Sequence, residues 1–201
     1  MRALLILTVK NEAAFLLEWL AHHRACGFSD VLAFSNDCGD GTDAMLDRLE
    51  AMGWLTHVRN PGPHDEGPQW AALKAADKHP LKRAADWVLF ADVDEFVNIH
   101  AGDHRLEALL AALPQADAIA LTWRLFGNGG IVGYADAPVT AQFVRAAPAT
   151  RRWFMAPMSP SPMPGGSARC SKRAACGVSS SSCRTGISTM WPVPRHFPAA
   201  R

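Results

Sequence analysis

The residues from Ala3 to Val9, which read Ala-Leu-Leu-Ile-Leu-Thr-Val, form a continuous apolar run that decides the fold class. A strand with one face in water alternates apolar and polar residues, whereas a strand covered on both faces is apolar throughout. After Lys10-Asn11-Glu12, residues 12–25 place apolar side chains at helical spacing, and Gly27 follows as a C-terminal stop. A buried strand followed by a helix is the first unit of an α/β fold.

The same alternation of short apolar runs and helix-period segments continues to about residue 125. We expect further strands at 31–34, 54–58, 87–91 and 118–125, and helices at 42–52, 69–78 and 106–113, with Thr42 as an N-cap. This order predicts a mostly parallel sheet with helices on both faces. In such sheets ligands bind at the carboxyl ends of the strands, so polar residues there are the first candidates for a site.

The 201 residues are enough for one domain with a sizeable core, and their charge is unevenly distributed. Residues 1–149 contain all 19 acidic residues and 12 Lys+Arg, a net charge of −7, whereas residues 150–201 contain 8 Lys+Arg and no acid, a net charge of +8. The total of +1 therefore hides two oppositely charged parts. We divide the chain into a domain over 1–149 and a basic tail over 150–201.

The tail has a different composition from the domain. It contains no Leu, Asp or Glu, but seven Pro, nine Ser and seven Arg, and it shows no sustained helical or strand period. Such a composition buries too little apolar surface to offset the entropy of ordering, which predicts a disordered tail. Shifted reading of a GC-rich gene also yields Arg, Pro, Ser, Ala and Cys, so an out-of-frame C-terminus is the other interpretation. Its basic charge has no motif for a specific nucleic acid.

Cysteine usage and hydropathy indicate the compartment. Five cysteines without regular spacing make no disulfide framework, and Cys26 and Cys38 are expected to be reduced. The apolar run that starts at Ala3 is too short for a signal peptide, and no run approaches the ~20 residues of a membrane span. We therefore expect a cytoplasmic protein, with association at the inner face of the membrane left open.

The acidic sequence Asp92-Val93-Asp94-Glu95 follows the apolar strand 87–91 directly. If the strand continues, the carboxylates of Asp92 and Asp94 point to the same side, because side chains alternate with period two. Two adjacent carboxylates repel each other unless a cation neutralises them, and Mg²⁺ or Mn²⁺ completes its shell with phosphate oxygens and water. The alternative is a solvated acidic loop.

Two other polar segments follow predicted strands. Lys10-Asn11-Glu12 stands where a nucleotide is contacted in many α/β folds, although Asn11 could instead cap the helix. Residues 35–42 could bind a base or ribose, or form only an Asx turn. His22 and His23 point about 100° apart on a helix, so they are poor co-ligands, and His23 is expected at the edge of the core.

These segments, in this order, resemble the family 2 glycosyltransferases. The resemblance rests on residues 8–12, on residues 36–42, on the helix from Gln69 to Ala76, and on residues 87–96 with their Asp-x-Asp-Glu-Phe ending. It covers about residues 1–145 and implies a GT-A fold, a Rossmann-like fold that binds nucleotide-sugars. The Asp-Glu-Phe ending is similar to that of a bacterial branch whose members carry a Lys-Asn-Glu motif.

The resemblance implies roles for individual residues. Asp94 would ligate Mn²⁺ or Mg²⁺ on the nucleotide diphosphate of a donor such as a UDP-sugar, and Asp92 would contact the ribose or the metal shell. The acceptor would be a glycan or lipid-linked molecule in polysaccharide assembly. The remaining nucleotide-sugar-binding residues would be Thr8, Asn11, Glu12, Asn36 and Asp37.

The resemblance is weaker in the acceptor half. An inverting enzyme needs a base, and Asp136 is the candidate, because Asp117 precedes a strand at the wrong edge and the later His196 lies in the tail. A truncated, catalytically inactive nucleotide-sugar-binding remnant is therefore an alternative to an active transferase. An Asp-x-Asp phosphatase or phosphotransferase is a third reading, disfavoured because its nucleophile normally follows the first strand.

The two interpretations of the tail predict different gene sequences. If residues 150–201 are out of frame, an intact reading frame should continue in a shifted phase downstream of codon 150. Sequencing the gene across this codon tests the prediction. Absence of any such frame would leave a genuine basic tail.

Overall fold

A computed structural model describes residues 1–133, 135–147 and 187–192, which fall into two compact units. The first unit comprises Met1–Thr122 together with Ile187–Arg201, and the second comprises Trp123–Gly186. Within the described ranges no helix is long and apolar enough to cross a membrane.

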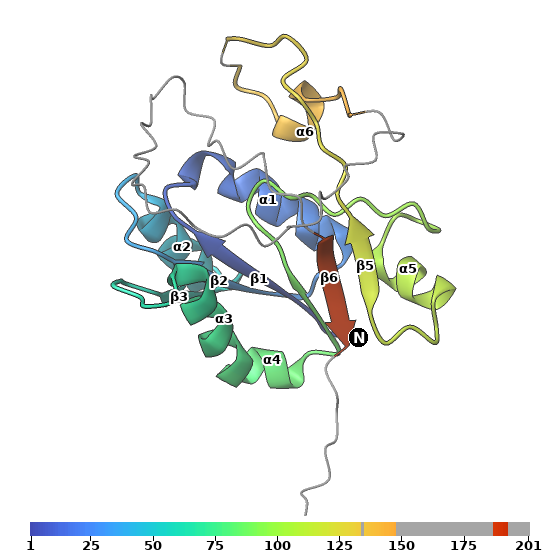
Figure 1. Ribbon diagram of the computed structural model, residues 1–201, viewed down its shortest axis with the longest axis horizontal. Helices are drawn as coiled ribbons and strands as arrows, with labels where there is room; N and C mark the ends of the chain where they lie inside the picture. The colour runs from blue at the N-terminus through green and yellow to red at the C-terminus, as the bar shows by residue number, and fades with distance from the viewer. Residues whose placement is uncertain (134, 148–186, 193–201) are drawn as a thin grey trace, which may run out of the picture. The chain divides into compact units, whose positions relative to one another are not determined.

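The first unit is built on a six-stranded sheet with the order β3-β2-β1-β4-β6-β5 (Figure 1). Strands β3, β2, β1 and β4 are parallel, and β6 is antiparallel to both of its neighbours, β4 and β5. The strand bounds are Ala3–Val9 for β1, Asp30–Ser35 for β2, Thr56–Arg59 for β3, Trp87–Phe90 for β4, Ile119–Thr122 for β5 and Ile187–Pro192 for β6.

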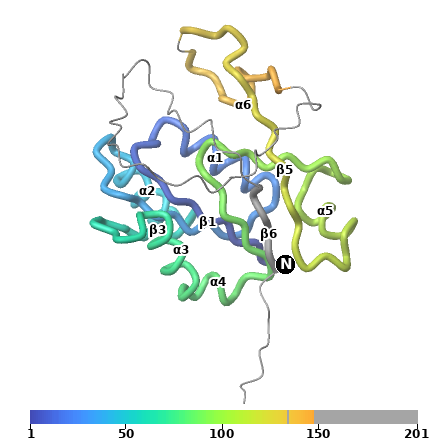
Figure 2. The backbone as a smooth tube through the Cα atoms, in the orientation of Figure 1, coloured from blue at the N-terminus to red at the C-terminus, as the bar shows by residue number. Residues whose placement is uncertain are grey.

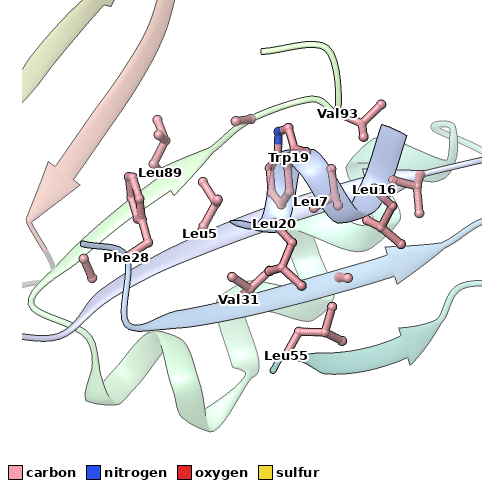
Figure 3. Packing of buried hydrophobic residues seen from close by; sticks show 14 of the residues in the cluster. Leu5, Leu7, Leu16, Trp19, Leu20, Phe28, Val31, Leu55, Leu89 and Val93 are labelled. Atoms are coloured by element: carbon pink, nitrogen blue, oxygen red, sulfur yellow. The ribbon is translucent and has the colours of Figure 1, made fainter. Parts of the chain in front are cut away.

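Helices cover both faces of this sheet, as the apolar run in β1 predicts. Leu5 and Leu7 pack into a cluster with α1 (Ala13–Cys26), α2 (Thr42–Ala51) and α5 (Leu106–Ala112), part of which is drawn in Figure 3. Leu4 and Ile6 point to the opposite face, where α3 (Pro68–Lys78) and α4 (Pro80–Ala84) lie. All four β1 side chains are at most 4% exposed. The predicted α/β class is therefore confirmed.

The chain path makes the carboxyl ends of β1 and β4 a topological switch point. From β1 the chain adds β2 and then β3 on one side, and it next places β4 on the other side of β1. The connections through α1 and α2 lie on one face, and those through α3 and α4 lie on the other. Loops diverge above the sheet at such a point, which is where α/β folds bind ligands.

Most predicted elements are present, but α4 was not predicted. His79 precedes Pro80, and a residue before proline is driven out of the helical region, so α3 ends and His79 adopts an extended ψ of 142°. The His79 Nδ1 atom then accepts a hydrogen bond from the Leu81 amide, which caps a new helix with proline in its first turn.

Strand β6 differs from the expectation that the tail has no regular structure. Residues 187–192 read Ile-Ser-Thr-Met-Trp-Pro, and they pair with β4 through Val88 and with β5 along its whole length. A short run with β-branched and aromatic residues suffices here because two neighbouring strands supply its hydrogen-bond partners. These six residues are the part of the predicted tail that the structure describes, and the other residues of the tail lie outside the described ranges.

The second unit has little regular structure in its described part. It contains the short helix α6 (Val139–Gln142) and an isolated antiparallel bridge between Phe126 and Ala146. The predicted strand at 118–125 ends at Thr122, so its last three residues belong to this unit instead.

Helix α1 buries a histidine among its apolar residues. Leu16, Trp19, Leu20 and His23 form its buried face, whereas Phe15, which the helical spacing also placed there, is 36% exposed. Gly27 ends the helix in the left-handed conformation, as expected. His23 is 0% exposed, and its ring lies 4.5 Å from that of Trp19.

The partners of His23 define its protonation. Its Nδ1 atom lies 2.8 Å from the Trp19 carbonyl oxygen, which only accepts, so Nδ1 carries the hydrogen. Its Nε2 atom lies 3.3 Å from the Val97 amide, which only donates, so Nε2 is bare. Burial, together with the nearby His22, lowers the pKa of His23 to about 4 despite the hydrogen bond to Trp19.

This histidine makes the stability of the fold depend on pH. The unfolded chain, with an ordinary histidine pKa of 6.5, binds the proton before the folded chain does. The free energy of unfolding should therefore be unaffected above pH 6.5 and fall between pH 6.5 and 4, by about 3 kcal/mol at roughly 1.4 kcal/mol per pKa unit.

Calorimetric melting across this pH range should show a shallower loss of stability in His23→Gln than in the wild type. His100→Gln is the matched control, because His100 is exposed. Equal slopes for the wild type and both variants would show that His23 does not carry the effect.

Candidate functional site

The acidic segment that follows β4 forms a turn at the switch point. The β4 ladder with β1 ends at the pair Ile6–Phe90, and the Ala91 amide makes the next bond to the Ile6 carbonyl. The Glu95 amide then donates to the Asp92 carbonyl at 3.1 Å, which closes the turn. The expectation that Asp92 and Asp94 continue an extended strand is therefore wrong, because the chain leaves the sheet before Asp92.

Helix α1 holds the turn through hydrogen bonds to the turn's backbone. The buried Trp19 indole N–H donates to the Asp92 carbonyl at 2.9 Å and to the Glu95 carbonyl at 3.0 Å. The Glu95 carboxylate accepts from the Asp92 amide at 3.2 Å. Val93 points into the core beside Trp19 (Figure 3) and is 8% exposed, whereas Asp94 is exposed. The turn thus directs one side chain to the core and presents the next to solvent.

Three junctions bring carboxylates together at this edge of the sheet. Burial raises the pKa of Glu12, which follows β1, and the negative charges of Asp94, Asp40 and Asp92 raise it further. The pKa of Glu12 thus indicates acidic neighbours from the segments after β2 and β4. The arrangement creates a negative potential that favours a bound cation. Within the described ranges, no group of three or more His, Cys, Asp or Glu residues could hold a metal by itself.

The loop after β1 is fixed to the loop after β2. Asn11 adopts a φ of 60°, and its side-chain oxygen accepts from the Gly39 amide at 2.7 Å. Asn11 therefore does not cap α1, whose N-cap residue is Glu12. Instead, Asp40 reaches across and accepts from the Ala13 amide at 3.2 Å, which satisfies a free donor of the first helical turn.

Thr42 connects the same two loops rather than capping α2. The N-cap residue of α2 is Gly41, with a φ of 93°, and Thr42 is the first helical residue. The buried Thr42 hydroxyl accepts from the Glu12 amide at 3.0 Å and donates to Asp40 at 2.6 Å. This hydrogen bond is the main cause that lowers the pKa of Asp40. The backbone that carries Glu12 is thereby set by Thr42.

Asn36 and Asp37, predicted to contact the nucleotide, position a third loop. Asn36 is buried; it donates to the Val9 carbonyl at 3.0 Å and accepts from Asn60 at 2.6 Å. Asp37 accepts from the Gly62 amide at 3.0 Å. The loop from 60 to 67 is therefore held against the end of β2.

Thr8 keeps an unused polar atom at the same edge. Its hydroxyl oxygen is buried and, within the described part of the chain, has no hydrogen-bond partner. The side chain lies near the end of β1, opposite Phe34 of β2. A buried polar atom without a partner is costly, so a ligand or water that reaches it would be favoured.

The other candidates lie in the second unit, at the amino edge of the sheet, or outside the described residues. Asp136 is exposed in the second unit. Asp117 precedes β5, whose direction matches that of β4, so it lies at the amino edge of the sheet, as expected. His196 falls outside the residues that the structure describes.

A serine, a histidine and an aspartate also form a hydrogen-bonded chain that the sequence did not reveal. His57 Nε2 lies 2.8 Å from the Ser35 hydroxyl, and its Nδ1 lies 2.7 Å from the Asp47 carboxylate. The order matches that of a serine hydrolase, but Ser35 is 2% exposed and the His57 side chain 1%. A nucleophile must reach its substrate, so these three hydrogen-bonded residues serve instead as a structural link between β2, β3 and α2.

Three comparisons with known proteins bear on this site. The chain is 25% identical over 128 residues to a glycosyltransferase family 92 protein of Oryza sativa subsp. japonica, a match that covers 61% of this chain and 21% of that protein. It is 27% identical over 138 residues to a family 92 protein of Ricinus communis, covering 64% and 23%. The chain thus spans about a fifth of the length of these curated relatives.

Among solved structures, S. aureus TarS (residues 1–349) is similar, with 16% identity and a TM-score of 0.47 over 67% of this chain and 39% of that one. The same TarS fragment in complex with UDP gives 17% identity and a TM-score of 0.47, covering 67% and 38%.

The glycosyltransferase part of the sequence resemblance is thus confirmed, whereas its assignment to family 2 is not. The family model that matches is that of glycosyltransferase family 92, over residues 7–143. Because these residues make up more than half of the chain and contain the acidic turn with both loops beside it, the chain belongs to glycosyltransferase family 92.

Proposed function

We propose that this chain carries the donor-binding part of a metal-dependent glycosyltransferase, which transfers sugar from a nucleotide-sugar, taken to be a UDP-sugar, to a glycan or lipid-linked acceptor. The observation that carries the proposal is that the acidic residues Glu12, Asp40, Asp92 and Asp94 follow the neighbouring strands β1, β2 and β4 at the switch point of an α/β sheet. Because the chain belongs to a glycosyltransferase family, we assign these carboxylates to the binding of a nucleotide-sugar. A diphosphate is anionic, so a cation between it and an acidic site strengthens its binding.

The cation proposed is Mn²⁺ or Mg²⁺, held by Asp94 with support from Asp92. The Asp94 carboxylate is exposed, and acidic neighbours add to the effect of burial in raising the pKa of Glu12; both features fit such an ion. These hard ions take one or two protein carboxylates and complete their shell with phosphate oxygens and water, which agrees with a site that offers few ligands. When bound, the ion would supply Lewis-acid stabilisation of the departing diphosphate.

The nucleoside part of the donor is proposed to lie over the ends of β1 and β2. The buried Thr8 hydroxyl, which has no hydrogen-bond partner within the described residues, could bind the donor, and Glu12 is half-buried beside the acidic turn. Asn11, Asn36 and Asp37 support the pocket by fixing the loops that would surround it. This assigns them a supporting role, which is narrower than the direct contacts that the family resemblance implies.

The catalytic base is proposed to be Asp136, which would deprotonate the acceptor hydroxyl in an inverting transfer. Asp117 and Asp136 are the only acidic residues within residues 108–147. Asp117 is excluded because it lies at the amino edge of the sheet, which leaves Asp136 as the candidate. Location at the inner face of the membrane stays a prediction.

Nucleotide binding should stabilise the fold, and metal should increase this stabilisation. UDP with Mn²⁺ at about 100-fold above its Kd should raise the free energy of unfolding by about 2.7 kcal/mol, since a ligand that binds only the native state adds this much. Thermal shift with UDP alone, Mn²⁺ alone and both together measures the effect.

Asp94→Asn should abolish the Mn²⁺-dependent part of this shift. Asp117→Asn is the matched control, because Asp117 is an exposed aspartate at the opposite edge of the same sheet. A shift in Asp94→Asn equal to that of the wild type would refute the metal assignment. Absence of any nucleotide-dependent shift in the wild type would refute donor binding.

Turnover is the separate test of activity. With Mn²⁺ and a panel of UDP-sugars, the wild type should release UDP, and Asp136→Asn should lower this rate by about 100-fold or more, the usual contribution of a general base. Donor binding without any UDP release would identify a nucleotide-sugar-binding protein. Release of phosphate from phosphomonoesters would instead identify a phosphatase.

A further inference from the structure

We infer that Trp19 and His23 are positioning residues that hold the acidic turn in the conformation able to bind a metal and a diphosphate. The inference rests on the proposed function and extends it to residues that touch neither ligand. It assigns to α1 a role beyond packing, because α1 supplies the hydrogen bonds that fix the backbone on both sides of Asp94.

The first anchor is the indole of Trp19. The residue is 0% exposed, and its single polar atom donates to two carbonyls of the turn, those of Asp92 and Glu95. The two carbonyls lie before and after Asp94 in the sequence. One buried donor therefore bridges the open side of the turn and fixes the direction in which Asp94 points.

The second anchor holds the chain directly after the turn. The Val97 amide donates to His23 Nε2 at 3.3 Å, and the Val97 carbonyl lies 2.8 Å from His22 Nε2 and 3.5 Å from the Cys26 thiol. Both polar groups of one peptide residue are thus bound by one helix. The backbone trace in Figure 2 shows this segment passing over α1 between β4 and α5.

Electrostatics explains why such anchors would be needed. Asp92 and Asp94 stand two residues apart in one turn, and like charges this close in sequence repel each other unless a cation neutralises them. The anchors bind main-chain groups and not the carboxylates, so they oppose this repulsion without using the groups proposed to hold the metal. A turn that is held in place before the ligand arrives loses less entropy on binding.

A purely structural role for Trp19 makes a different prediction from a positioning role. Trp19→Phe keeps an aromatic ring in the core and removes only the N–H donor. We expect its affinity for UDP in the presence of Mn²⁺ to fall about tenfold, because the donor shared by two carbonyls of the turn is lost, while its affinity for UDP without metal stays unchanged. Calorimetric titration with and without Mn²⁺ separates the two.

Matched variants sharpen the comparison. Trp54→Phe changes a tryptophan that is 44% exposed and packs on Arg24, so it should leave both affinities unchanged. His23→Gln keeps an acceptor for the Val97 amide and should retain most of the Mn²⁺-dependent affinity, whereas His23→Leu lacks this acceptor and should lose it. An equal loss of affinity with and without Mn²⁺ in Trp19→Phe would overturn the inference.

Hydrogen exchange tests the anchors independently of nucleotide binding. In Trp19→Phe the amides of residues 92–97 should exchange faster, while those of β1 and β2 stay as protected as in the wild type. Uniformly faster exchange, or no change in the turn, would overturn the positioning role even if UDP binds. If the wild type binds no UDP, the proposed function fails, and this exchange pattern still decides whether α1 holds the turn.

Discussion

The hydrogen bonds from the Trp19 indole to the carbonyls of Asp92 and Glu95 are the constraint on which the candidate site depends. The turn buries only Val93 in the core, and the indole binds its backbone before and after Asp94. The indole reaches it because α1 packs along the sheet face formed by Leu5 and Leu7. The apolar run that decides the fold therefore also sets the position of the site, since a helix displaced by one turn would present another side chain there.

Around this turn, the fold uses most of its short polar side chains for its own backbone. Asn11, Asp40 and Thr42 connect the loops after β1 and β2, and Asn36 connects the end of β2 to the next loop. This explains how loops at a switch point keep one conformation without helix or strand hydrogen bonds. Asn11, Asn36 and Asp37 are thereby assigned to holding these loops.

The sequence predicted the sheet, its helices and the location of the acidic cluster, because these depend on the local periodicity of apolar residues. It did not predict the partner of each polar side chain. Asn11, Thr42 and Asn36 have the chemistry of caps and ligands alike, and the choice depends on which loops become neighbours in space. The turn at Asp92 was taken for an extended strand because its cause, Trp19, lies 73 residues earlier. Strand β6 was missed because its partners β4 and β5 come from a distant part of the chain.

We propose that α1 holds the acidic turn so that Asp94 can bind a metal ion on a nucleotide diphosphate. A crystal structure with UDP and Mn²⁺, with anomalous scattering used to locate the manganese, tests it most directly. We expect a manganese peak that is coordinated directly by the Asp94 carboxylate and by diphosphate oxygens, with the hydrogen bonds from Trp19 to the turn intact. A manganese ion or diphosphate bound away from Asp94, or a turn released from Trp19 in the complex, would contradict it.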